Sequence, residues 1–189
     1  AGLLYPWTKI VSRGQPDSLP CIIKSRVGAG GKDVSLVQSD LVELYSHTRP
    51  DDIWQEYLQP DDQEFTCGVY RSSDKKIRNI IFKRKLNAGV TVYGEVVEND
   101  QIEKLLAGVA KELNLIGSIN VQLRLTDRGP IIFEINPRFS STVVFRHLIG
   151  FKDLIWSINN KFGQPIANYI KPRVGKKFYR GTSEIFLET

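Results

Sequence analysis

The pattern of hydrophobic and polar residues divides the first half of the chain into short strands. Apolar runs at 19–24, 34–37 and 53–58 are too short for helices and favour strands. Two longer runs, 64–70 and 77–85, flank the polar turn Ser-Ser-Asp-Lys, which predicts a β-hairpin. This half of the chain is therefore expected to be built mainly from strands.

Two other segments have the spacing of apolar residues that is typical of amphipathic helices. Ser39 is placed to cap a short helix whose apolar face contains Leu41, Leu44 and Tyr45. The clearest helix spans residues 99–115, where Asp100 and Glu103 fit a capping box. Its apolar stripe contains Ile102, Leu105, Leu106, Val109 and Leu113. Residues 143–162 are expected to be helical in part, and the mixture of hairpins and helices predicts an α+β fold.

Strict alternation of apolar and polar residues predicts a second hairpin between residues 119 and 136. Asp127-Arg128-Gly129 would form a three-residue turn, with glycine in the left-handed conformation. Folding about this turn pairs two sets of polar residues, Gln122 with Glu134 and Asn120 with Asn136. Because side chains alternate between the faces of a sheet, all four are expected on one face.

The oxygen atoms of this polar face suit a magnesium ion. Mg²⁺ prefers hard oxygen ligands, commonly one or two carboxylates together with substrate phosphates. Glu134 offers a carboxylate, and Gln122 and Asn136 offer amide oxygens. Pro137 ends the strand, and Arg138 directly after it is placed to hold a phosphate or an oxyanion. The alternative is a solvated polar face with Arg138 in a surface salt bridge.

A glycine-rich loop follows the first buried strand. Lys24 ends that strand and would hold a phosphate as a point charge. Gly28, Gly30 and Gly31 would let backbone N–H groups approach other phosphate oxygens. The loop lacks the Gly-Lys-Ser/Thr ending of a Walker A motif, and a simple turn between two strands is the alternative.

A candidate nucleotide edge lies between these two features. The strand that contains Glu56, Tyr57 and Leu58 would recognise adenine through its backbone groups. Glu64 would accept hydrogen bonds from both ribose hydroxyls. Composition alone is equally consistent with a plain strand followed by an acidic turn residue.

Composition and charge narrow the classes of function. The 189 residues, 41% of them hydrophobic, suffice for one large domain or two lobes that share a cleft. The net charge of +5 suits a protein that handles anions without demanding nucleic acid. The basic stretch 171–180 is interpreted as a solvated face, and 182–187 as a last strand. No Gly-x-Ser-x-Gly elbow is present, which disfavours a serine hydrolase.

The cysteines and the apolar runs indicate a cytoplasmic protein. Cys21 and Cys67 give neither a disulfide framework nor a metal-ligand spacing, so we expect reduced core thiols. No apolar run approaches the roughly 20 residues that cross a bilayer, and the N-terminus lacks a signal-peptide layout. The absence of methionine fits either removal of an initiator or an excised fragment.

The order of these motifs resembles the ATP-grasp superfamily. The similarity is greatest to the ATP-grasp domains of the carbamoyl-phosphate synthetase large chain and its biotin-carboxylase-like relatives, and it covers residues 19–150. It rests on an ordered set of matching segments at 20–24, 28–31, 55–58, Glu64, 117–122 and 134–138.

The resemblance implies a two-lobed fold with ATP held between antiparallel sheets and their flanking helices. Residues 1–18 would be a lead-in segment. Residues 19–85 would form a small lobe with the lysine, the glycine loop and the adenine and ribose contacts. Residues 86–189 would form a larger lobe with the metal site.

The resemblance also implies an activity and a set of roles. Family members phosphorylate a carboxylate or bicarbonate, and an amine or other nucleophile then displaces the phosphate. The cofactors would be ATP and Mg²⁺, with Mn²⁺ as an alternative, and the partners would be a small carboxylate and an amine. Arg138 would be catalytic by stabilising the transferring phosphoryl group. The remaining candidates would bind nucleotide or metal: Lys24, Gly28, Gly30, Gly31, Glu56, Tyr57, Leu58 and Glu64 for ATP, and Gln122, Glu134 and Asn136 for Mg²⁺.

The sequence departs from the synthetase pattern in three ways. Ser140, Ser141 and Thr142 stand where a second arginine is expected, and Thr91 stands where a histidine is expected. Both differences disfavour carbamoyl-phosphate synthesis. The family's preceding domain and its upstream basic ATP contact have no counterpart, which suggests a missing N-terminal domain or a partner chain. An ATP-dependent ligase is the leading hypothesis, and a non-catalytic nucleotide-binding module or a basic nucleic-acid-binding protein is the alternative.

Overall fold

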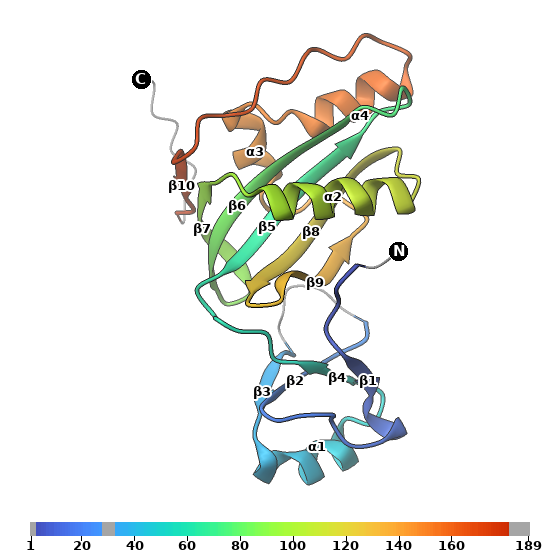
Figure 1. Ribbon diagram of the computed structural model, residues 1–189, viewed down its shortest axis with the longest axis vertical. Coiled ribbons are helices and arrows are strands. Elements are labelled where there is room, and N and C mark those ends of the chain that lie inside the picture. The colour runs from blue at the N-terminus through green and yellow to red at the C-terminus, as the bar shows by residue number, and fades with distance from the viewer. Residues whose placement is uncertain (1–2, 28–32, 182–189) are drawn as a thin grey trace. The chain divides into compact units, whose positions relative to one another are not determined.

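The computed structural model describes residues 3–27 and 33–181, and these fall into two compact units (Figure 1). One unit contains residues 60–87 and 91–181 together with the short segment 3–4. The other lies within Tyr5–Gln59 and includes Ala88–Val90. Three predicted phosphate-binding residues, Gly28, Gly30 and Gly31, lie outside the described residues, as does the predicted last strand.

The smaller unit is a four-stranded antiparallel sheet with the order β1-β4-β2-β3. Its strands are β1 (Thr8–Ile10), β2 (Cys21–Lys24), β3 (Ser35–Val37) and β4 (Ile53–Glu56). Two 3₁₀ turns, Val11–Arg13 and Ser39–Leu41, and the helix α1 (Val42–Thr48) complete it. One face of the sheet forms a core around the fully buried Trp54.

Two local predictions for this unit are wrong. Residues 1–18 are not only a lead-in segment, because β1 within them pairs with β4 along the edge of the sheet. Ser39 does not cap α1: it begins the 3₁₀ turn, and the residue before α1 is Leu41, which makes no side-chain capping bond.

The larger unit is a six-stranded sheet with the order β10-β7-β6-β5-β8-β9. Its strands are β5 (Glu64–Arg71), β6 (Ile77–Asn87), β7 (Val90–Val96), β8 (Gly117–Thr126), β9 (Gly129–Asn136) and β10 (Lys177–Tyr179). Its helices are α2 (Asp100–Glu112), α3 (Val143–Ile149) and α4 (Asp153–Lys161). The predicted β5–β6 hairpin is confirmed by its antiparallel register.

The predicted boundary at residue 85 does not match these units. The resemblance predicts β5 and β6 in the small lobe, but they lie in the larger unit. The reason is the pairing of β5 with β8 along its whole length, from Glu64 opposite Arg124 to Arg71 opposite Gly117. The unit boundary therefore falls between Gln59 and Pro60.

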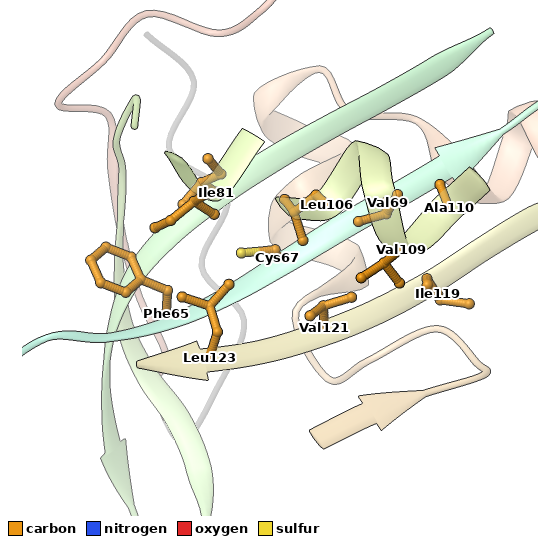
Figure 2. Packing of buried hydrophobic residues seen from close by; sticks show 11 residues of the cluster. Phe65, Cys67, Val69, Ile81, Leu106, Val109, Ala110, Ile119, Val121 and Leu123 are labelled. Atoms are coloured by element: carbon orange, nitrogen blue, oxygen red, sulfur yellow. The ribbon is translucent and has the colours of Figure 1, made fainter. Parts of the chain in front are cut away.

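One face of the large sheet packs against α2 through a mainly aliphatic core (Figure 2). The predicted helical stripe is largely confirmed, since Ile102, Leu106 and Val109 are buried in this core, whereas Leu113 is 55% exposed. The predicted capping box is wrong by one residue. Asn99 is the cap, and its side-chain oxygen accepts hydrogen bonds from the N–H groups of Gln101 and Ile102 at 3.0 Å.

The opposite face carries a second core near α3 and α4, and this core is aromatic. Phe82 and Tyr70 alternate along their strands with residues of the α2 face, so they point the other way. They join a cluster of buried or partly buried rings that also contains Phe145, Phe151, Trp156, Tyr169 and Phe178. This core leaves the other end of the same face available to polar residues.

The predicted α+β fold with two antiparallel sheets is confirmed. Both cysteines are buried and unpaired, as expected. Among the described residues, no helix is both long enough and apolar enough to cross a membrane.

Candidate functional site

The candidate site is formed by the β8–β9 hairpin, whose register at the site is the predicted one. Gln122 pairs with Glu134, and Asn120 pairs with Asn136. The predicted three-residue turn is wrong, because Thr126 pairs with Gly129 and leaves a two-residue loop. This shorter loop shifts the register by one residue, and a β-bulge next to Gln122 shifts it back. The polar residues therefore meet as expected, although the path between turn and site differs.

The side chains on this face form a continuous hydrogen-bonded chain across four strands. The Glu134 carboxylate oxygen Oε1 accepts from Asn136 Nδ2 at 2.5 Å and from Gln122 Nε2 at 3.4 Å. The Gln122 oxygen Oε1 accepts from Arg84 Nη2 at 2.7 Å. Arg84 in turn donates to Glu64 Oε1 from Nε at 3.0 Å and from Nη2 at 2.7 Å. The structure thus brings together Glu64, Gln122, Glu134 and Asn136 through a residue that was not predicted, Arg84.

Glu64 forms ion pairs with two arginines, Arg84 and Arg124. Its second oxygen, Oε2, accepts from Arg124 Nη2 at 2.6 Å, and Arg124 also pairs with Asp61 at 2.7 Å. The Glu64 side chain is only 14% exposed. Its carboxylate is therefore fixed in position within the sheet, and two guanidinium groups neutralise it.

A buried charged network lies beside the site on the same face. Asn120 is fully buried, and its side-chain oxygen accepts from Thr66 at 3.0 Å and from Arg146 at 3.4 Å. Arg146 also donates to Asp153 Oδ2 at 2.8 Å, and Ser118 donates to the same oxygen at 2.6 Å. The Asn120 amide nitrogen has no hydrogen-bond partner among the described residues.

Burial dominates the electrostatics of this ion pair. Arg146 and Asp153 are both fully buried. Desolvation raises the pKa of Asp153, and the attraction of Arg146 opposes that rise. Desolvation likewise lowers the pKa of Arg146, with Asp153 opposing the change. The pair is thus held in the folded protein at a cost in solvation, and each charge depends on the other.

The loop after β9 carries Arg138, which is exposed and donates from Nη1 to the Phe139 carbonyl at 3.1 Å. Two further arginines donate hydrogen bonds to this loop. Arg146 donates to Ser140 Oγ at 3.2 Å, and Arg180 donates to the Ser141 carbonyl at 2.5 Å. Arg180 also donates to the Thr91 carbonyl at 3.0 Å. It therefore connects Thr91 with Ser141, and both lie where the sequence departs from the synthetase pattern.

The other predicted nucleotide contacts belong to the smaller unit. Lys24 ends β2 and is half-buried, and Glu56 ends β4, where its carboxylate accepts from the Trp7 N–H at 3.4 Å. Tyr57 is half-buried and Leu58 is buried, both just beyond β4. Their predicted roles, like that of the glycine loop, stay predictions.

The donor set on the β8–β9 face suits a hard cation with few protein ligands. In the described part of the chain, no group of three His, Cys, Asp or Glu side chains could hold a metal ion. Glu134 is exposed, and both neighbouring amides already lie against its carboxylate. One carboxylate with neutral oxygen donors is the kind of site in which Mg²⁺ keeps substrate phosphates as further ligands. Among the described residues of this face, Glu134 would be the charged ligand of a magnesium–nucleotide complex, and the two amides fit as neutral ligands once their oxygens turn toward the ion.

Sequence reasoning missed the arginines that organise this face. Strand alternation places Arg84 on the same face as Phe82, so the face of its side chain can be predicted from the sequence. The position of β5 between β6 and β8, which brings Arg84 within reach of both Glu64 and Gln122, cannot be predicted in this way. Arg146 lies in an apolar segment whose pattern predicts only a helix, so its role in the site could not be predicted from that pattern.

Comparisons with known proteins agree with this architecture. Residues 48–177 match the model of a family described as ATP-grasp in the biosynthetic pathway with Ter operon. Lys24 lies outside the matched residues, whereas Glu64, the β8–β9 hairpin and Arg138 lie within them. An uncharacterized protein of Sinorhizobium fredii, y4rH, is 25% identical over 143 residues, which are 65% of this chain and 29% of that protein.

Two solved structures share the fold at low identity. The ADP complex of an N5-carboxyaminoimidazole ribonucleotide synthetase, purK, matches with a TM-score of 0.72 and 18% identity over 93% of this chain and 51% of its own. The biotin carboxylase domain of the Hydrogenobacter thermophilus 2-oxoglutarate carboxylase, in complex with MgADP and bicarbonate, matches with a TM-score of 0.70 and 14% identity over 93% of this chain and 46% of its own.

The chain thus spans about half the length of these solved chains and less than a third of the curated relative. The family match covers more than half of the chain, and the fold agrees with it. The chain belongs to the ATP-grasp family.

Proposed function

We propose that this domain binds ATP with Mg²⁺ and activates a carboxylate or bicarbonate as an acyl phosphate for attack by an amine. The observation that carries the proposal is the Glu134 cluster. An exposed carboxylate lies between two amide side chains on neighbouring strands, three residues before Pro137 and four before the exposed Arg138. In a member of the ATP-grasp family, this arrangement suits a metal-bound phosphate.

Some residues of the chain would hold the metal ion, and Arg138 would stabilise the transferring phosphoryl group. Glu134 would supply the negative charge that retains the cation. The amides of Asn136 and Gln122 direct their nitrogens at Glu134 Oε1, so each would supply a neutral oxygen only after the amide turns over. When bound, the magnesium ion would neutralise phosphate charge as the phosphoryl group transfers. Arg138 would stabilise negative charge that develops on the transferring group, since a guanidinium donates several hydrogen bonds in a fixed plane.

Two bond exchanges make up the proposed reaction. A carboxylate oxygen of the substrate attacks the γ-phosphorus of ATP, and the bond to the ADP oxygen breaks. An amine nitrogen then attacks the activated carbonyl carbon, the bond to phosphate breaks, and the amine loses a proton. The ligands of the two solved structures with this fold, ADP in one and MgADP, ADP and bicarbonate in the other, support ATP and bicarbonate as substrates.

A non-catalytic nucleotide-binding module is the second candidate. It is favoured by the departures from the synthetase pattern, because Thr91 stands where a histidine is expected and Ser140, Ser141 and Thr142 stand where a second arginine is expected. This reading keeps ATP binding and removes turnover.

Hydroxylamine trapping separates the two candidates. The full chain is incubated with MgATP, hydroxylamine and a panel of small carboxylates, and both ADP and hydroxamate are measured. A ligase releases ADP together with an equal amount of hydroxamate for at least one carboxylate, and Arg138→Met loses this activity. A binding module is stabilised against heat by MgATP but releases no ADP with any carboxylate. A chain that MgATP does not stabilise would contradict both.

A further inference from the structure

Arg84 occupies a position that the proposed reaction does not yet explain. Its guanidinium lies between Glu64 and Gln122, and its side chain is only 6% exposed. The nitrogen Nη2 donates to both neighbours at 2.7 Å, while Nε donates to Glu64 at 3.0 Å. Glu64 is itself held by Arg124, so Arg84 is fixed on that side.

This contact determines which end of the Gln122 amide faces the metal site. The amide oxygen is directed at Arg84, and the amide nitrogen is directed at Glu134 Oε1. Only the oxygen can bind a hard cation, because the nitrogen carries two hydrogens and has no lone pair to offer. In this arrangement Gln122 therefore donates to Glu134 instead of offering an oxygen beside it.

Bringing the oxygen beside Glu134 requires the amide to turn over. That rotation gives up a hydrogen bond from a charged donor, which is stronger than a bond between neutral groups. It also turns the amide N–H groups toward the guanidinium of Arg84, so that two donors face each other. Arg84 consequently opposes the orientation of Gln122 in which the side chain could bind metal.

We propose that Arg84 is a positioning residue that competes with the cation for the Gln122 oxygen and thereby lowers the affinity of the site for metal. This inference rests on the proposed function, since it takes Glu134 as the charged metal ligand. It assigns Gln122 a conditional role: hydrogen-bond donor to Glu134 while Arg84 holds it, and metal ligand once Arg84 is removed.

Arg124 provides a matched control for the effect of charge alone. It pairs with the same carboxylate, Glu64, at 2.6 Å and is similarly buried, at 13% exposure. Arg124→Met removes one positive charge near the site and leaves the bond between Arg84 and Gln122 in place. Arg84→Met removes the same charge and also frees the amide. A difference between the two variants therefore measures the competition for the oxygen.

The test is a titration of the full chain with Mn²⁺ alone, followed by the electron paramagnetic resonance signal of the free ion. Arg84→Met is expected to bind Mn²⁺ about tenfold more tightly than the parent, the low end for loss of one charge-assisted hydrogen bond. Arg124→Met is expected to change the affinity by no more than about twofold. The double variant Arg84→Met/Gln122→Met should return to the parent affinity, because it lacks the freed oxygen.

A second variant keeps the test valid if Arg84→Met does not fold. Arg84→Lys retains the charge but has no planar fork with which to hold Glu64 and Gln122 together, so an intermediate gain is expected. An unchanged or weaker affinity in whichever of the two variants folds would overturn the proposal. An equal gain in Arg124→Met would overturn it as well.

Glu134→Gln distinguishes this failure from failure of the proposed function. If Glu134→Gln loses Mn²⁺ binding but Arg84→Met shows no gain, the metal site stands and only the role of Arg84 is wrong. If Glu134→Gln binds Mn²⁺ like the parent, the metal site itself is misassigned, and the role of Arg84 is refuted with it.

Discussion

Replacing Arg146 with methionine tests the buried charges beneath the candidate site. Arg146 and Asp153 are fully buried and lie 2.8 Å apart. Methionine fills much of the arginine volume, but it leaves the Asp153 carboxylate in the interior, where the Ser118 hydroxyl is its remaining side-chain donor in the described part of the chain. Removing one partner of a buried pair typically costs about 3–5 kcal/mol of unfolding free energy.

The magnitude should depend on the remaining charge more than on the lost contacts. Asp153→Asn leaves the buried Arg146 charge without its partner, so it is expected to cost a similar amount of unfolding free energy. The double variant Arg146→Met/Asp153→Asn contains no uncompensated charge, and its amide can still accept from Ser118. We therefore expect the double variant to lose about 2 kcal/mol or less, well below the sum of the single variants.

The pH dependence of Arg146→Met follows from the pKa of Asp153. Desolvation raises the folded-state pKa of Asp153 above its ordinary value of 3.8, and Arg146 opposes this rise. Without Arg146 the folded protein binds a proton more readily than the unfolded chain. Stability is then lost as pH rises through the folded pKa and recovered as pH falls toward 3.8. The deficit of the variant relative to the parent should narrow on acidification.

Urea unfolding followed by circular dichroism measures these free energies at pH 7 and in acidic buffer. Non-additivity of about 3 kcal/mol or more in the double-mutant cycle supports the reasoning. Single variants that lose less than about 1 kcal/mol, or losses that simply add, would refute it. A deficit that widens as pH falls would contradict the assigned pKa direction.

Two further predictions concern local features of the fold. Asn99→Ala should cost about 1 kcal/mol in the same urea assay, because the α2 cap is lost, whereas Asp100→Ala should cost clearly less; an equal loss in both would argue against Asn99 as the cap. The thiols of Cys21 and Cys67 should not react with Ellman's reagent at pH 8 in the native state and should both react in urea. Both are buried, and burial raises the pKa of Cys21 to about 11 and that of Cys67 further; rapid reaction of the native protein would contradict this.

The site hairpin shows what alternation along a strand can predict. The pairing of Gln122 with Glu134 follows from polar and apolar alternation, which fixes the face of each side chain. The turn and the bulge cannot be predicted in the same way, because their effects on register cancel at the site. The sequence therefore predicts the pair correctly without predicting the backbone path that produces it.

The unit boundary and the role of Arg84 show what local patterns cannot predict. Alternation identifies β5 and β6 as a hairpin, but it does not say which sheet the hairpin joins. That choice depends on the pairing of β5 with β8, about 50 residues later in the chain. The same long-range pairing places Arg84 between Glu64 and Gln122, so neither the boundary nor the arginine could be predicted from neighbouring residues.

The Arg146–Asp153 pair was missed for a different reason. Its residues lie on α3 and α4, in a segment whose apolar character predicts only helix. Their contact depends on the turn between the helices, where Gly150 takes a φ of 113° that favours glycine. A charged residue in an apolar segment signals either an exposed or a paired position, and the segment alone does not identify the partner.

Calorimetric titration of ATP into the parent and into Glu134→Gln, with Mg²⁺ and with EDTA, tests the central claim most directly. Glu134 is exposed, so its replacement should leave the unfolding temperature nearly unchanged. We predict that the parent binds ATP more tightly with Mg²⁺ than with EDTA, and that Glu134→Gln loses this difference. Equal dependence on Mg²⁺ in both proteins would contradict the assignment of the metal site to the β8–β9 hairpin.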